Sequence, residues 1–156
     1  MNTNISKTSR LSAGLTGIAG EYLVAGELSR RGYVASITLR NTRGIDILAS
    51  NADATKSVGI QVKTNQGGGK KWILSEKIEK DIATNLFFVF VLLNGLDTPE
   101  YHIVPRAEVT KYVSEGHQEW LSKSGRSGQA HKDNPIRNFI DKEDKYLNRW
   151  DLLGLD

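Results

Sequence analysis

The chain has 156 residues, of which 38% are hydrophobic and 25% are charged, and it contains no cysteine. This length and composition predict one globular domain with its own core, and they exclude a disulfide framework and a thiolate metal site. No run of about 18 apolar residues occurs, and the first seven residues lack the apolar stretch of a signal peptide, so we expect a cytoplasmic protein with no membrane contact.

The net charge of +3 is unevenly distributed. Residues 1–75 carry ten Lys and Arg against four Asp and Glu, whereas residues 76–156 carry eleven against fourteen. The positive N-terminal half fits a polyanionic partner, although a bias of this size is also common on an ordinary solvated surface.

An amphipathic helix is predicted from about residue 10 to residue 31, after a disordered lead-in at residues 1–9. Its apolar positions recur at spacings of three and four: they are Leu11, Leu15, Ile18, Tyr22, Ala25 and Leu28. Gly14, Gly17 and Gly20 predict a groove that admits another stretch of backbone. Glu21 falls at the border of the apolar stripe. It is either a solvated side chain or an acid that reaches a site on the adjoining sheet.

Two alternating segments rich in β-branched residues, at 44–49 and 58–64, predict a β-hairpin. The polar residues 50–56 between them are typical of a turn, and a further strand is expected at residues 33–39. A turn centred in the middle of the insert pairs residues whose numbers add up to 107.

In that register an acid, an amide and an amine converge on one face of the hairpin. Asp46 lies opposite Gln61, and Lys63 shares the face of Gln61 because side chains alternate along a strand, which leaves Ile60 and Val62 on the other face. Such a group suits metal-assisted hydrolysis, since carboxylate and carbonyl oxygens hold a hard divalent cation and an ammonium orients a water. Taken alone, the hairpin is better explained as the solvated face of a two-stranded ribbon.

The remaining elements predict a central sheet flanked by helices. The apolar run at residues 86–93 lacks alternation, which is typical of a strand buried on both faces in a parallel or mixed sheet. In chain order we expect strands at 72–74, 86–93 and 101–104, a helix at 107–121, a basic loop at 122–135, a helix at 136–147 and a docking tail at 151–155.

Six basic residues are candidates for nucleic-acid contacts, and they lie in three polar segments. The glycine-rich segment at 65–71 lacks the spacing of a P-loop. The candidates are Arg40 and Arg43 in the turn before the second strand, Lys70 and Lys71 after the glycines, and Arg126 and Lys132 in the loop at 122–135.

The three histidines lie far apart in the sequence, and their spacing does not indicate a zinc site. We expect His102 to be a half-buried packing residue on a strand and His117 to lie on a helix surface, while His131 is in a loop where it could contact a phosphate. The tryptophans could stack on bases, but core packing explains them better: they are Trp72, Trp120 and Trp150.

Taken together, these elements resemble the PD-(D/E)XK nuclease superfamily, in particular its Holliday junction resolvase-like and Mrr-like restriction endonuclease branches. The matching residues are those at 17–21 in the first helix, Gly44-Ile45-Asp46 in one strand and Gln61-Val62-Lys63 in the next, where they form the QxK variant of the motif. The resemblance covers residues 14–93. It implies a restriction-endonuclease-like α/β core at residues 10–121, with residues 122–156 as a C-terminal helical extension of the same domain.

The resemblance also implies a function. Lys63, Asp46, Gln61 and Glu21 would be the catalytic residues, and Mg²⁺ or Mn²⁺ would be held by Asp46, Gln61 and Glu21. The protein would then be a metal-dependent endonuclease that hydrolyses DNA phosphodiester bonds, of the junction-resolving or restriction type, and a homodimer where it cuts both strands.

Two features depart from the family pattern. Gln61 stands where a second carboxylate is usual, which removes one negative charge from the metal site, and no proline precedes Asp46. The first departure favours the alternative of a catalytically inactive nuclease-fold module that binds nucleic acid or a protein partner. An RNA-associated nuclease fold fits the charge equally well.

Overall fold

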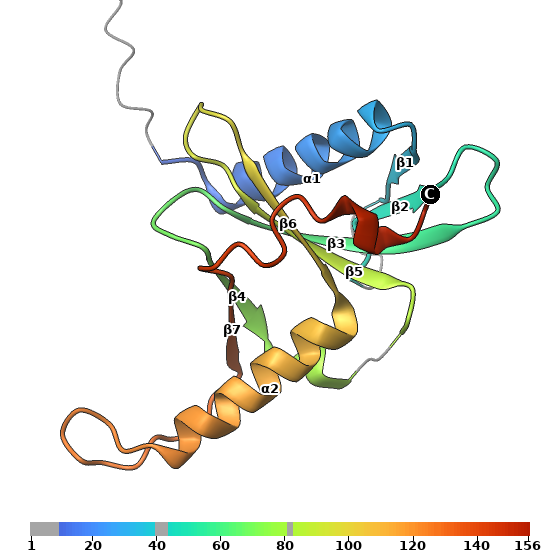
Figure 1. The fold of residues 1–156 in the computed structure, drawn as a ribbon. Helices are drawn as coiled ribbons and strands as arrows, with labels where there is room; N and C mark the ends of the chain where they lie inside the picture. The colour runs from blue at the N-terminus through green and yellow to red at the C-terminus, as the bar shows by residue number, and fades with distance from the viewer. Residues whose placement is uncertain (1–9, 40–43, 81–82) are drawn as a thin grey trace, which may run out of the picture.

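A computed structural model describes residues 10–39, 44–80 and 83–156, so the lead-in expected at residues 1–9 lies outside the described residues. Five strands form a mixed sheet in the order β1-β2-β3-β5-β6, and β4 and β7 form a small second sheet (Figure 1). The strands are β1 (Val34–Ile37), β2 (Ile47–Ser50), β3 (Ser57–Asn65), β4 (Lys71–Ser75), β5 (Leu86–Leu92), β6 (Glu100–Pro105) and β7 (Ile136–Ile140). The helices are α1 (Ala13–Arg30), α2 (Arg106–Ser122) and two 3₁₀ helices, η1 (Glu76–Lys80) and η2 (Trp150–Leu153).

The apolar segment predicted as a buried strand forms the centre of the main sheet. β5 runs parallel to β3 on one side and antiparallel to β6 on the other, and its residues from Phe87 to Leu92 are all buried. A strand covered on both faces has no solvent-facing positions that would select polar residues. The α/β class and the central mixed sheet are therefore confirmed.

The hairpin of β2 and β3 has the predicted register. Ile47 pairs with Ile60 and Leu48 pairs with Gly59, so that paired residue numbers add up to 107. The turn between the strands is stabilised by Asn51, whose side chain accepts a hydrogen bond from the Lys56 backbone N–H at 2.8 Å and whose amide donates to Thr55.

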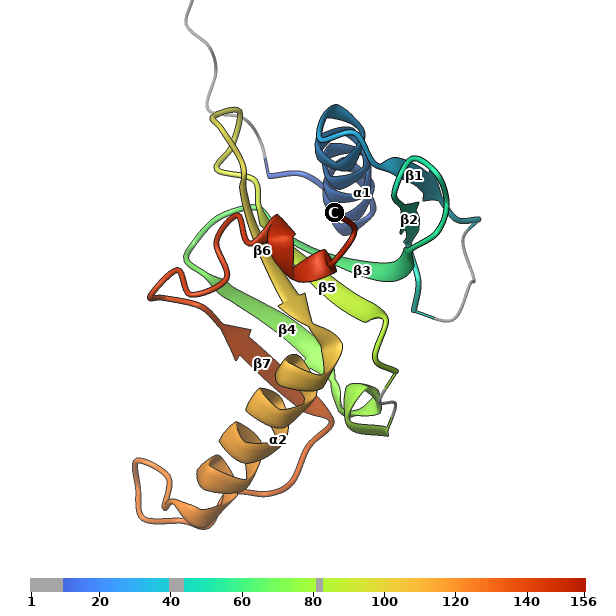
Figure 2. The same ribbon diagram turned by 45° about the vertical axis from the view of Figure 1, so that its right-hand side comes forward.

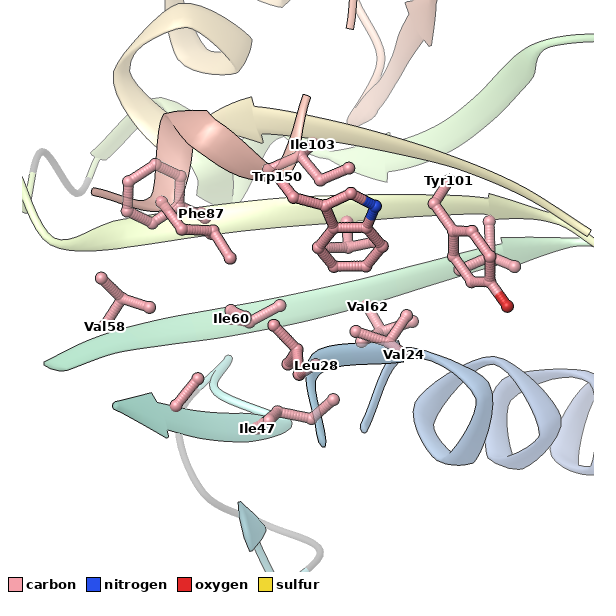
Figure 3. Packing of buried hydrophobic residues seen from close by; sticks show 14 of the residues in the cluster. Val24, Leu28, Ile47, Val58, Ile60, Val62, Phe87, Tyr101, Ile103 and Trp150 are labelled. Carbon is pink, nitrogen blue, oxygen red and sulfur yellow. The ribbon is translucent and has the colours of Figure 1, made fainter. Parts of the chain in front are cut away.

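One face of the main sheet is closed by α1 and by the C-terminal segment. Val24 and Leu28 of α1 belong to the same buried cluster as Ile60 of β3 (Figure 3). In that cluster the Trp150 ring lies against Tyr101 of β6, with ring centroids 5.6 Å apart. The C-terminal tail therefore docks as expected, and its buried residues are Trp150, Leu153 and Leu155.

The opposite face is covered over β5 and β6 but open over the hairpin. The small sheet and α2 pack on β5, where Phe90 stacks on Phe139 of β7 with centroids 4.5 Å apart. Figure 2 shows α1 on one side of the main sheet and β4, β7 and α2 on the other. Leu48 of β2 points to this second face and remains 52% exposed. The side chains of Gln61 and Lys63 consequently lie at the border of the covered area.

The C-terminal helix predicted at residues 136–147 is wrong, and with it the helical character of the C-terminal extension. Residues 136–140 form β7, which pairs antiparallel with β4 from Lys71–Ile140 to Ser75–Ile136. A turn follows in which Asp144 has a left-handed backbone (φ +58°), and this conformation ends regular structure. The only helical residues after the strand are the four of η2, within the part of the chain that is described.

Candidate active site

Asp46 lies where the ladder between β2 and β3 ends. Its backbone N–H donates to Ile60 O at 2.8 Å, and its carboxylate oxygen Oδ2 accepts a hydrogen bond from the Val62 N–H at 2.7 Å. The backbone ladder ends at the Ile47–Ile60 pair. The next N–H of β3 on this side, that of Val62, therefore bonds to the Asp46 carboxylate instead of to a backbone carbonyl of β2. The acid of the GxD motif is held against β3 by one oxygen, which leaves Oδ1 to coordinate a ligand.

The backbone of Val62 adds a second oxygen at the same place. The N–H and C=O of one strand residue point to the same edge, because paired residues exchange both hydrogen bonds across that edge. Since the Val62 N–H points at Asp46, the Val62 carbonyl is directed to the same edge. The Val62 side chain is buried on the opposite face with Ile60, as the alternation predicted.

Gln61 and Lys63 share the open face of β3 and are both half-buried. The Gln61 side chain lies beside Gly44, where an added Cβ would be 3.7 Å from Gln61 Oε1. Gly44 has φ +64°, a left-handed conformation that suits glycine. The structure therefore places Gln61 beside the turn at Gly44, and it places the Asp46 carboxylate at the Val62 N–H, between Gln61 and Lys63 along β3.

Lys63 borders two cavities. A cleft of about 730 Å³ runs between the start of α1 and the end of β3, and its walls include Gly17, Lys63 and Gln66. A second cavity of about 420 Å³ lies on the other side, between Lys63, Lys71 and Trp72. Lys63 is half-buried and lines both cavities, so part of the residue is accessible from solvent.

Glu21 lies on α1 and is half-buried. The apolar stripe whose border it was predicted to occupy is not the buried side of the helix, since Leu15 and Tyr22 are exposed. α1 packs on the face of the sheet opposite Lys63. Gly17, one helical turn earlier and on the same side of the helix, lines the same cleft as Lys63. The structure leaves Glu21 on the α1 side of β3, and not on the face shared by Gln61 and Lys63.

The four basic candidates that the structure describes are not gathered around the site. Lys71 is exposed beside Lys63, whereas Lys70 is ion-paired with Glu100 (2.9 Å) and with Asp144. Arg126 and Lys132 are exposed on the loop after α2, at the end of the helix that points away from the main sheet (Figures 1 and 2). Arg40 and Arg43 lie outside the described residues.

The histidines differ from expectation. His102 is fully buried rather than half-buried, with its Nδ1 2.7 Å from Asp141 Oδ2. His117 is buried rather than on the surface, and its Nε2 lies 2.7 Å from Asp133 Oδ1. That hydrogen bond lowers the pKa of Asp133.

The aromatic residues follow the packing interpretation in part. Trp72 and Trp150 are buried, as core packing predicts, but Trp120 is 37% exposed. His131 stacks on the Trp120 ring with centroids 4.1 Å apart and bonds the Trp120 carbonyl through Nδ1. This exposed ring pair fastens the loop at 122–135 to the end of α2.

A second polar cluster was not found from the sequence. It joins Lys70 with Glu100 and His102 of β6 and with Asp141 and Asp144 of the turn after β7. The hydrogen bonds and charges of Asp144 and Glu100 raise the pKa of Lys70, and Lys70 lowers the pKa of Glu100. Glu100 and His102 are two residues apart on one strand and so share a face, which the sequence could have indicated. The two aspartates, however, lie in the segment that was predicted to be a helix.

No protein-family model, curated protein or solved structure matches this chain. The case for a function therefore depends on the geometry of the two polar clusters. Across residues 10–39, 44–80 and 83–156, no helix combines the length and the apolarity needed to cross a membrane.

Proposed function

We propose that this protein is a metal-dependent endonuclease that hydrolyses DNA phosphodiester bonds at the open edge of β3. The observation that carries the proposal is the Asp46 carboxylate, which accepts the Val62 N–H at 2.7 Å between Gln61 and Lys63. The order of the motifs, their strand phase and the confirmed register agree with the resemblance to the PD-(D/E)XK superfamily. DNA as the substrate and a homodimer as the cutting form are carried over from that resemblance.

The oxygen donors at this edge fit a hard divalent cation. Asp46 Oδ1, the Val62 carbonyl and the Gln61 amide oxygen are the ligand types that Mg²⁺ and Mn²⁺ prefer, and the Asp46 and Val62 groups are directed to one edge by the hydrogen bond between them. Glu21 would add a second carboxylate from α1. When bound, the ion supplies the positive charge that polarises a phosphodiester and acidifies water.

Lys63 would act on the phosphate directly. An ammonium donates three hydrogen bonds and has no acceptor, so Lys63 Nζ can orient an attacking water and offset the charge that develops on the pentavalent phosphorus. The cleft beside it, at about 730 Å³, gives room for a phosphodiester segment. The exposed Lys71 on the other side of Lys63 would contact a neighbouring phosphate.

The replacement Lys63→Ala tests the assignment. We expect it to abolish Mg²⁺-dependent cleavage of duplex and branched DNA while the thermal unfolding temperature stays within a few degrees, because Lys63 is half-buried and lines two open cavities. Lys71→Ala is the matched control, and we expect it to reduce DNA affinity but keep cleavage. Wild-type rates of cleavage by the Lys63→Ala protein would refute the proposal.

A second candidate function is a nuclease-fold module that binds nucleic acid without cutting it. It is favoured by Gln61, since a neutral amide on the shared face leaves Asp46 as the one carboxylate of β2 and β3 that is directed to this edge. A single carboxylate binds Mg²⁺ weakly, because the ion keeps most of its water unless charge draws it in.

Gln61→Glu separates the two functions. The added carboxylate should raise Mg²⁺ affinity by about tenfold, an order set by one further unit charge near the ion, as measured by calorimetry with Asp46→Asn as the non-binding control. If the native function is cleavage, the wild-type protein with Gln61 cleaves DNA. If only the Gln61→Glu protein cleaves, the binding module is the native function and the edge of β3 is a disabled site.

A further inference from the structure

The polar cluster around His102 is built as a ligand site, at a distance from the edge of β3. It is formed where the small sheet meets β6, from the residue before β4, two residues of β6 and the turn after β7 (Figure 1). Trp72 of β4 lies between the two locations, since it lines the cavity beside Lys63 and its ring is 5.2 Å from that of His102. The cluster is therefore separate from the proposed nuclease site, which does not use its residues.

His102 is oriented within this cluster by a buried carboxylate. Asp141 Oδ1 accepts the Lys145 N–H, and Asp141 Oδ2 accepts the Tyr146 N–H, both at 3.0 Å. A carboxyl group that takes two backbone donors is an acceptor on both oxygens, so His102 Nδ1, 2.7 Å away, is the donor in their hydrogen bond. In the neutral imidazole, which is the form that ligates a metal, the lone pair is then on Nε2.

The Nε2 lone pair faces another acceptor. His102 is fully buried, and its Nε2 has no hydrogen-bond partner in the described part of the protein. Glu100 Oε2 lies 3.7 Å from Nε2, which is too far for a hydrogen bond. A buried acceptor without a donor is costly, and a cation between the two atoms would satisfy both.

The separations match those of a coordinated metal. Ligand atoms of Glu100, His102 and Asp144 lie within 4.8 Å of one another. Two atoms that each lie about 2.1 Å from a tetrahedral zinc ion are roughly 3.4 Å apart, close to the 3.7 Å between Nε2 and Oε2. The Asp141–His102 pair reproduces the carboxylate–histidine arrangement that orients metal-ligating imidazoles.

The ammonium of Lys70 already supplies a positive charge between Glu100 and Asp144. Its ammonium is ion-paired with Glu100 at 2.9 Å and with Asp144, so it neutralises the two acids and leaves Nε2 unsatisfied. Lys70 follows Gly68 and Gly69, whose backbones have φ of +89° and +118° and which have open space around them. A long side chain on such a loop can leave the acids without moving either sheet.

We propose that Glu100, His102 and Asp144 form a binding site for a divalent transition metal ion, Zn²⁺ foremost, with Asp141 as the positioning residue for His102. The ammonium of Lys70 holds the two carboxylates when no metal is bound, and it is displaced when the ion enters. Imidazole nitrogen together with carboxylate oxygen selects zinc over magnesium. This site is therefore separate from the all-oxygen site at Asp46.

The proposal is tested by Zn²⁺ titration of the full chain against a competing chelator dye. Asp144 is exposed, so Asp144→Asn should fold normally and bind Zn²⁺ at least tenfold more weakly, as is usual when a charged ligand is neutralised. Lys70→Met should bind about tenfold more tightly, because one competing unit charge is removed. Lys71→Met is the matched control, since Lys71 has no such ion pair, and it should leave Zn²⁺ affinity unchanged.

A spectroscopic readout identifies the ligand directly. Zn²⁺ should shift the ring Nε2 resonance of His102 in a histidine-selective ¹⁵N spectrum and leave Nδ1 protonated, and it should do so equally in an Asp46→Asn protein whose proposed nuclease site is disabled. If Zn²⁺ shifts only His117 or His131, or if Lys70→Met and Asp144→Asn bind Zn²⁺ as the wild type does, the inference is wrong. Neither result would bear on cleavage at Lys63.

Discussion

Position 20 in α1 has room for glycine alone. A Cβ added at Gly20 would overlap the Thr64 hydroxyl and lie 3.0 Å from Thr64 Cβ, whereas one added at Gly17 or Gly14 meets no atom within 4 Å. The predicted groove is therefore a single close approach, one residue before Glu21. It seats α1 on the end of β3 that carries Lys63.

The two glycines should respond to alanine with opposite signs. Gly20→Ala is expected to lower the free energy of unfolding by about 1 to 3 kcal/mol, since Thr64 is short and branched and cannot swing aside. Gly17→Ala should raise it by up to about 1 kcal/mol, the helix propensity difference. Urea denaturation measures both. A stabilising Gly20→Ala would show that α1 does not sit against Thr64.

At the residue scale, the sequence predicts which side chains share a face wherever they follow the simple period of a strand. The common face of Gln61 and Lys63 follows from strand alternation, and the Ile47–Ile60 pair that brings Asp46 beside β3 follows from a symmetric turn. The partners of His102 could not be found this way. Asp141 and Asp144 reach it only because a separate strand brings their turn alongside β6.

At the scale of elements, β7 was misread because a charged residue occupies one of its inward positions. Arg137 is 5% exposed and shares its inward face with the buried Phe139, whereas Ile136 and Asn138 are exposed. Its guanidinium is satisfied by Glu79 at 2.5 Å and by the Asn134 carbonyl at 2.6 Å. An inward arginine hides the period-2 pattern from a prediction based on hydrophobicity. The elements α1, α2 and β5 are predicted correctly, but the apolar stripe predicted for α1 is wrong. Leu11, Leu15 and Tyr22 are exposed, and the buried side of the helix is instead the one on which Gly20 meets Thr64; its buried residues are Thr16, Gly20, Val24 and Leu28.

The contribution of β7 to the core can be measured with two substitutions on the same strand. Phe139 is 1% exposed and stacks on Phe90, so Phe139→Ala should cost about 3 to 5 kcal/mol of unfolding free energy. Ile136 is 52% exposed, and Ile136→Ala should cost less than about 1 kcal/mol. Similar costs for the two would mean that residues 136–140 are not a strand with one buried face.

For the molecule as a whole, the charge asymmetry of the sequence is partly cancelled by folding. Lys70 from the positive half is paired with Glu100 and Asp144 of the negative half, so it does not add to a field that would attract a polyanion. Arg126 and Lys132 project from the far end of α2 (Figure 2). Charge counts along a chain predict partners only where the fold keeps like charges together, and here Lys63 and Lys71 are the described lysines that share a cavity.

The pairing of β4 with β7 also constrains how the protein is made. Lys71 bonds to a strand that ends at Ile140, and a ribosome adds roughly 5 to 20 residues per second, so β4 waits several seconds for its partner to leave the exit tunnel. Until then the aromatic side of β5, with Phe88 and Phe90, has no cover from Phe139. We therefore expect the nascent chain to expose this apolar surface late in translation, in a state that chaperones recognise. The exposure ends when β7, in the C-terminal fifth of the chain, pairs with β4.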